Sequence, residues 1–138
     1  MYKGILPQNT LILERYRVLL FIKQGINAET YSVKGNDGNL YFFKLFNYSK
    51  LSLSAFDSEK NLLEFELLKG VKHPNIVTYK DSGELIYDGK KYGYLVLDFI
   101  SGETLAERTI REPIPSFYDV KQIALGILNG LSYLHCLN

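Results

Sequence analysis

The sequence predicts an α+β fold, in which an antiparallel sheet of five strands carries one helix and is followed by helices alone. Three observations support this prediction. Runs rich in strand-forming side chains flank two strong turn signals, Gly35-Asn36-Asp37-Gly38 and Asp88-Gly89. Between these turns, residues 59–70 have leucines at helical spacing. Beyond residue 103, the apolar side chains recur only at the helical period.

The expected elements follow the order β-β-β-α-β-β and then helices, after a lead-in segment at residues 1–13. Strands are expected at residues 16–23, 29–34 and 39–47, then at 76–81 with 85–87, and at 91–99. A short helix over 104–111 is closed by Pro113 and Pro115. A last helix of about twenty residues begins after Ser116, which forms a capping-box-like start with Asp119. The apolar positions of this helix are Val120, Ile123, Ile127, Leu131 and Leu134.

Composition argues against several classes of protein. The chain has 138 residues and a net charge of +1, which gives no reason to expect nucleic acid or an anionic membrane as the main partner. Its longest apolar run, Val18–Ile22, is too short to span a bilayer. The single cysteine, Cys136, rules out an internal disulfide, and with two histidines it makes no metal-ligand set. We therefore expect a cytoplasmic protein without a membrane, nucleic-acid or metal site.

The helix expected between the third and fourth strands has an acidic side chain on its apolar side. On a helical wheel, Glu64 falls within the arc formed by Phe56, Leu63, Leu67 and Leu68. A carboxylate on the buried side of a helix is unfavourable unless a cation meets it. The helix should end near Gly70, because His73-Pro74 cannot continue it. The sequence thus predicts a cationic partner for Glu64.

In this order, the motifs resemble the amino-terminal part of the protein kinases of the eukaryotic-like serine/threonine type. The resemblance covers about residues 14–138. Lys44, in Tyr-Phe-Phe-Lys, matches the strand lysine of the family's V-A-I-K motif. Glu64, nine residues before His73 of His-Pro-Asn-Ile-Val, matches the helix glutamate. The resemblance implies that Lys44 pairs with Glu64 and holds the α- and β-phosphates of ATP. If this pair is partly buried, removing either partner should cost a few kcal/mol, on the order of a stranded buried charge.

The same resemblance implies a kinase N-lobe over residues 14–100, a hinge at 97–102, and a partial C-lobe of two helices over 103–138. Leu97 takes the gatekeeper position. Backbone groups of Asp98 and Ile100, on either side of Phe99, would bond the adenine edge. His135 ends the helix that precedes the family's H-R-D motif.

Two departures from the family pattern lie in the implied nucleotide site. The loop G-x-G-x-x-G-x-V aligns with the run from Lys23 to Thr30, and its implied nucleotide-binding residues are Lys23, Gln24, Gly25, Ile26, Asn27, Ala28 and Thr30. Only Gly25 is kept, although glycine lets the backbone approach phosphates closely. An ordinary hairpin turn is the alternative interpretation of this run. Phe42 stands where the family has a small alanine lining the adenine pocket, so it fills part of that space unless the strand shifts.

The sequence contains no H-R-D and no D-F-G. In the family, these motifs supply the catalytic aspartate and the side chains that hold magnesium. We therefore expect the chain alone not to transfer phosphate, and its parent to act on protein hydroxyls. A non-catalytic kinase-like scaffold or interaction module (a pseudokinase) remains the alternative, and an unrelated α+β interaction domain is a third. The apolar stripe of residues 116–135 would face water, so we expect it to self-associate or to dock on the sheet.

Overall fold

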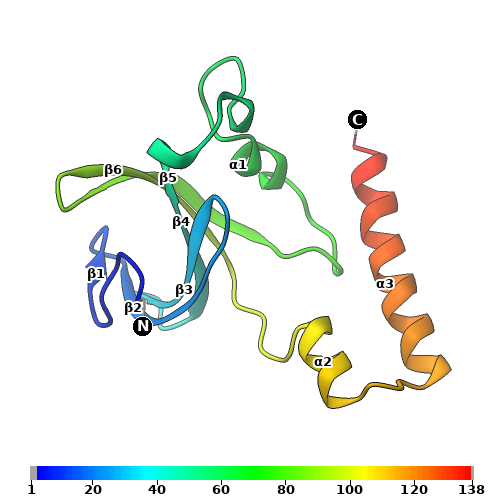
Figure 1. Cartoon of the computed structure of the whole chain (residues 1–138). Coiled ribbons are helices and arrows are strands. Elements are labelled where there is room, and N and C mark those ends of the chain that lie inside the picture. The colour runs from blue at the N-terminus through cyan, green and yellow to red at the C-terminus, as the bar shows by residue number, and fades with distance from the viewer. Residues whose placement is uncertain (1–2, 138) are drawn as a thin grey trace. The chain divides into compact units, whose positions relative to one another are not determined.

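The structure is a computed structural model that describes residues 3–137 (Figure 1). It divides into two compact units. The first comprises the chain up to Gly70 together with Thr78–Phe99. The second comprises Val71–Val77 together with the chain from Ile100 onward. Within the described residues, no helix is both long and apolar enough to cross a membrane.

The first unit is built on an antiparallel sheet, which has six strands within residues 3–137 rather than the five expected. The strands are β1 (Leu11–Ile12), β2 (Tyr16–Gln24), β3 (Ala28–Gly35), β4 (Leu40–Asn47), β5 (Tyr79–Tyr87) and β6 (Lys90–Asp98), in the order β1-β2-β3-β4-β6-β5. The additional strand, β1, is two residues of the expected lead-in that pair with Tyr16 and Arg17 of β2. Such a short edge strand has no periodicity of its own, so the sequence does not reveal it.

The fourth expected strand begins later than predicted. We expected a strand from residue 76, but β5 begins at Tyr79 and continues without a break to Tyr87. The amide of Ile76 donates to the carbonyl of His73 at 3.1 Å, so the chain is still turning after Pro74. The β-forming residues Ile76 and Val77 therefore belong to a loop, because a local turn outweighs their strand propensity.

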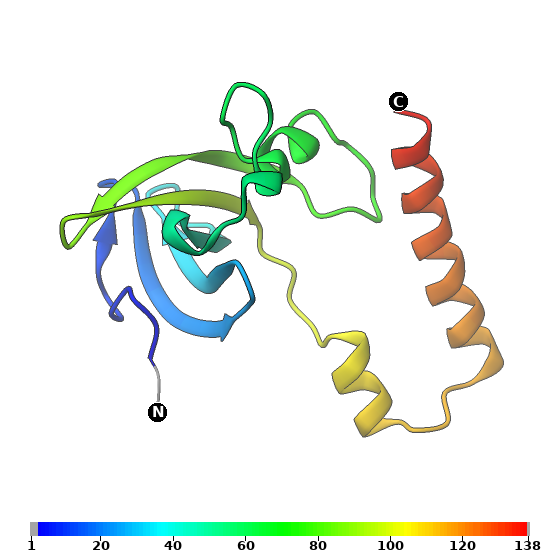
Figure 2. The same ribbon diagram turned by 45° about the horizontal axis from the view of Figure 1, so that its top comes forward.

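The sheet of this unit is curled (Figure 2). Its core lies on one face of the sheet. Side chains alternate along β3 and β4, so that Tyr31, Val33 and Phe43 have no exposed surface and Leu45 has 1%. The Phe43 ring stacks on Tyr94 of β6 with centroids 5.5 Å apart. This burial fixes the register, and with it the face on which the remaining side chains of β4 lie.

A polar cluster joins two strands that are far apart in the order of the sheet. The carboxylate of Asp81 on β5 accepts hydrogen bonds from Arg15 at 2.8 Å, from Tyr16 at 3.2 Å and from Tyr94 at 3.3 Å. Arg15 and Tyr16 belong to the β1–β2 end of the sheet, so its curl brings the two ends together. Burial, followed by the charge of Asp81, raises the pKa of Tyr16 to about 12.

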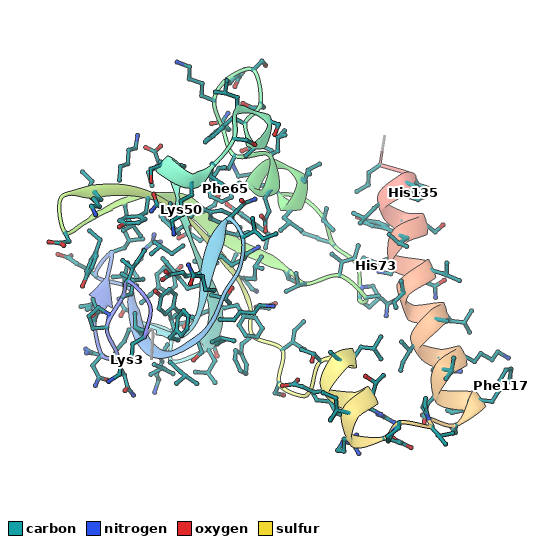
Figure 3. The ribbon with its side chains drawn as sticks, viewed as in Figure 1. Lys3, Lys50, Phe65, His73, Phe117 and His135 are labelled. Carbon is teal, nitrogen blue, oxygen red and sulfur yellow. The ribbon has the colours of Figure 1, made fainter. Side chains whose placement is uncertain are left out.

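Helix α1 (Leu63–Leu68) is shorter than the predicted helix at 59–70. The Asp57 carboxylate accepts from the amides of Glu59 at 2.9 Å and Asn61 at 2.8 Å, and these bonds compete with a helical turn. The predicted buried arc is also wrong, because Leu62 and Phe65 are buried while Leu67 is 71% exposed. Phe65 projects from α1 toward the sheet (Figure 3). The helix does end as expected, with Gly70 following at a φ of 79°.

The second unit contains α2 (Leu105–Arg111) and α3 (Phe117–His135). Thr104 and Glu107 form a complete capping box at the start of α2. The Ser116 hydroxyl accepts from the Asp119 amide at 3.1 Å at the start of α3, as the sequence predicts.

The loop at residues 71–77 packs on α3. His73 lies beside this helix, with its ring 5.0 Å from that of Tyr133 (Figure 3). The Tyr133 hydroxyl accepts from the Lys72 amide at 3.3 Å. A Cβ added at Gly130 would meet Ile76 at 3.4 Å, an ordinary contact distance, so the loop leaves room for a methyl group at this position but not for a larger side chain.

Candidate functional site

Lys44 lies on the face of β4 opposite the core. In the ladder it pairs with Thr30 of β3 and with Leu95 of β6. Phe42 lies two residues before it, and alternation along the strand therefore places both on the same face. Phe43 and Leu45, which are buried in the core, occupy the other face. The register thus brings together Phe42, Lys44 and Thr30, three of the residues singled out in the sequence.

The structure also brings Lys44 and Glu64 together in an ion pair, with Nζ donating to Oε1. The side chains of Lys44 and Glu64 are 27% and 41% exposed, so the pair is half-buried. The Phe46 ring meets Phe65 of α1 edge-on, with centroids 5.5 Å apart. Lys44 Nζ lies 5.3 Å from the centre of the same Phe46 ring. This aromatic contact holds α1 against β4, which keeps Glu64 within reach of Lys44.

The loop from Lys23 to Thr30 forms the tip of the β2–β3 hairpin. The Gly25 amide donates to the Ala28 carbonyl at 2.8 Å and closes the turn, while Ile26 is 95% exposed. None of residues 23–28 has a positive φ. Lys23 and Ala28, which replace the glycines of the family pattern, are therefore accommodated without backbone strain.

Phe42 is in contact with Phe99, the residue that follows β6. Their ring centroids are 4.7 Å apart and the rings are inclined at 39°. Leu97 pairs with Phe42 in the ladder and is 8% exposed. The Asp98 carboxylate pairs with Lys80 at 3.1 Å, and the Asp98 amide donates to the Thr78 carbonyl at 3.0 Å. Aromatic side chains therefore occupy this part of the sheet face.

The remaining hinge residue, Ile100, is 62% exposed and is the first residue of the second unit after Phe99.

A scan against protein-family models matches residues 16–138 to the protein kinase domain. The chain belongs to the protein kinase family. The six-stranded sheet with α1 corresponds to the N-lobe of a kinase, and α2 and α3 correspond to the beginning of its C-lobe. Family membership implies the use of ATP, as kinases transfer its γ-phosphoryl group.

Two kinases illustrate the similarity. The chain is 33% identical over 99 residues to myosin light chain kinase A of Dictyostelium discoideum. This aligned region covers 71% of the chain and 31% of the relative. It is also 33% identical over 121 residues to ribosomal protein S6 kinase alpha-2 of Mus musculus. That aligned region covers 83% of the chain and 15% of the relative. The chain thus spans less than a third of the length of each of these kinases.

Sequence reasoning missed one polar residue beside the loop of this kinase N-lobe. Glu29, directly after Ala28, is only 5% exposed. The sequence did contain a signal, because Glu29 lies two residues before Tyr31 and four before Val33, so all three side chains point to the same face of the strand. The acidic character of Glu29 made it look like a solvent-facing residue.

Proposed function

We propose that this chain is the ATP-binding lobe of a serine/threonine protein kinase, whose full-length form transfers phosphate from ATP to protein hydroxyls. The main support is the Lys44–Glu64 ion pair on the open face of the sheet, beside the β2–β3 hairpin. The similarity to two protein kinases supports this substrate class.

In this proposal, Lys44 is the group that binds phosphate. Its ammonium group donates to the α- and β-phosphate oxygens, and Glu64 holds it in place from α1. The backbone of the loop from Lys23 to Thr30 covers the phosphates. Phe42, Leu97, Asp98, Phe99 and Ile100 are assigned to the side of the adenine base.

Magnesium supplies charge neutralisation at the phosphates when it is bound to a kinase. Within residues 3–137, no cluster of three or more His, Cys, Asp or Glu side chains is placed to hold a metal ion. The proposal therefore concerns the binding of the nucleotide by Lys44 and the loop, and assigns no metal ligand to this chain.

One observation favours the second candidate, a non-catalytic kinase-like scaffold. The contact between Phe42 and Phe99 fills space on the side assigned to the base. A nucleotide would have to displace one ring, at the expense of an aromatic contact of about 0.5–1.5 kcal/mol. This amount lowers affinity by roughly two- to tenfold and does not by itself abolish binding.

Binding of ATP to three variants of the chain distinguishes the two functions. Lys44→Met removes a charge-assisted bond to phosphate and should weaken binding about ten- to a hundredfold. The matched control is Lys91→Met, because Lys91 is also a strand lysine in an ion pair, 2.8 Å from Glu84, but lies away from the site. We expect this control to bind as tightly as the unmodified chain.

Phe42→Ala provides the third measurement. If the ring only narrows the site, this change should strengthen ATP binding by up to about tenfold. Absence of ATP binding in the unmodified chain and in Phe42→Ala alike, with both folded, would contradict nucleotide binding and favour the scaffold.

A further inference from the structure

The buried carboxylate of Glu29 lies next to the loop assigned to the phosphates. Glu29 directly follows Ala28, the last residue of the turn, and is the buried charged side chain in the described core. Two residues further along β3, Tyr31 has no exposed surface, and its hydroxyl donates to Glu29 Oε2. Burial, followed by this hydrogen bond, raises the pKa of Tyr31, so the hydroxyl keeps the proton that it donates.

The segment ahead of β1 crosses these two side chains. The amide of Ile5 donates to Glu29 Oε2 at 2.9 Å, and the amide of Leu6 donates to the Tyr31 hydroxyl at 3.1 Å. Leu6 is 1% exposed, so the segment is packed on the hairpin as well as bonded to it. In Figure 1 this stretch is the dark blue chain that passes beside β2.

The close approach of this segment depends on Gly4. Its φ is +83°, a conformation that side chains with a Cβ rarely adopt. A Cβ at Gly4 would lie 2.6 Å from the Tyr31 hydroxyl oxygen and 2.7 Å from the Phe21 ring. A larger residue would therefore displace the segment from Tyr31.

Ile5 also reaches the loop itself. A small hollow beneath the turn is lined by Ile5, residues 24–29, Leu45, Asn47 and Lys50. Burying a carboxylate is unfavourable unless hydrogen bonds compensate, and an apolar side chain at position 29 would serve the core as well or better. The role of Glu29 is therefore geometric, because its hydrogen bonds fix the position of the segment containing Ile5.

We propose that residues 4–6 form a strap, and that Glu29 and Tyr31 are positioning residues through which this strap sets the place of the 24–28 turn over the nucleotide phosphates. The inference rests on the proposed function of nucleotide binding.

The test compares Tyr31→Phe and Glu29→Gln with a matched control, Tyr41→Phe. Tyr41 donates to the Asp37 carboxylate beside the opposite turn of β3, so the control removes the same kind of bond away from the loop. Hydrogen exchange of the Gly25 amide, which closes the turn, reports on the loop without any ligand. Tyr31→Phe removes the hydrogen bonds of the hydroxyl to Glu29 and from the Leu6 amide, and Glu29→Gln replaces a charged acceptor with a neutral one. Each change should speed exchange at Gly25 about three- to tenfold, and the control should leave it unchanged.

A second readout separates positioning from general stability. ATP and adenosine share a base and a ribose, but only ATP has the phosphates that the loop covers. We expect Tyr31→Phe and Glu29→Gln to weaken ATP binding about threefold or more and to leave adenosine binding unchanged. Equal losses for the two ligands, or exchange at Gly25 no faster than in Tyr41→Phe, would overturn the inference.

Gly4→Val alters the strap itself and leaves β3 unchanged. It therefore tests the inference even if the variants in β3 do not fold. It should speed exchange at Gly25 as Tyr31→Phe does, and unchanged exchange contradicts the strap. If the unmodified chain binds neither ATP nor adenosine, the proposed function fails. The exchange of Gly25 still shows whether the strap holds the turn.

Discussion

The ion pair between Lys44 and Glu64 permits a quantitative prediction of stability. The perturbation is a double-mutant cycle of Lys44→Met, Glu64→Gln and the two together, with unfolding free energies measured in urea. The cycle removes effects that belong to one partner alone, such as the contact of Lys44 with the Phe46 ring. What remains is the energy with which the two charges couple.

The exposure of the two side chains sets the expected magnitude. Removing one partner of a fully buried pair lowers the free energy of unfolding by about 3–5 kcal/mol, whereas an exposed pair contributes about 0.2–1 kcal/mol to it. Lys44 and Glu64 are 27% and 41% exposed, so we expect a coupling of about 1 kcal/mol. This lies below the few kcal/mol that the sequence suggests, because the two side chains are only partly buried. Raising the salt concentration should lower it further.

The same cycle on Lys91 and Glu84 provides a matched reference. These two side chains are 58% and 54% exposed, so their coupling should be smaller, at about 0–0.5 kcal/mol. A coupling near zero for Lys44 and Glu64 would mean that the pair does not form in solution. A value above about 3 kcal/mol would refute the half-buried geometry.

Three further predictions concern other parts of the chain. The pKa of Tyr16 is raised from 10 to about 12, so its contribution to stability is complete below pH 10 and is lost as the pH rises to 12, by roughly 2–3 kcal/mol. Circular dichroism with tyrosinate absorbance would follow the alkaline unfolding, and Tyr16→Phe should reduce the loss without abolishing it, because the pKa of Tyr48 is also raised to about 12. In α3, the methyl group of Gly130→Ala would meet Ile76 at an ordinary contact distance, so this variant should stabilise the folded chain by about 0.5–1 kcal/mol. The larger side chain of Gly130→Leu should instead destabilise it by about 1–3 kcal/mol. Thermal melts that rank the two variants in the opposite order would contradict this packing. The side chains of Leu128 and Leu131 are 60% and 44% exposed, so we expect self-association through residues 116–135 that Leu128→Glu weakens, and a concentration-independent monomer in sedimentation velocity would argue against it.

Much of the fold follows from local patterns in the sequence. The turns at residues 35–38 and 88–89, the start of α3 at Ser116 and the end of α1 before Gly70 depend on backbone conformations that particular residues favour. The pairing of Lys44 with Glu64 was also predicted, because the resemblance to the protein kinases implies it, whereas the helical pattern alone indicated only some cation beside Glu64. These features depend on neighbours in the chain or on motifs typical of the family.

Local patterns misled where a competing bond or a distant contact decided the outcome. Residues 59–62 do not form the predicted first turn of the helix, because the Asp57 carboxylate accepts from the amides of Glu59 and Asn61. The face of α1 that is buried was also mispredicted, since it depends on where Phe65 meets Phe46 of the sheet. In both cases the periodicity was real, but another interaction was stronger.

By itself, the sequence determined the order of the elements, most of their boundaries, the family of the protein and the pairing of Lys44 with Glu64. Only the tertiary structure decided that Asp81 meets Arg15, that Phe42 meets Phe99, and that Glu29 is buried under the segment containing Ile5. Each of these contacts joins residues that are distant in the chain. Their formation depends on the curl and register of the whole sheet, which no short stretch of sequence specifies.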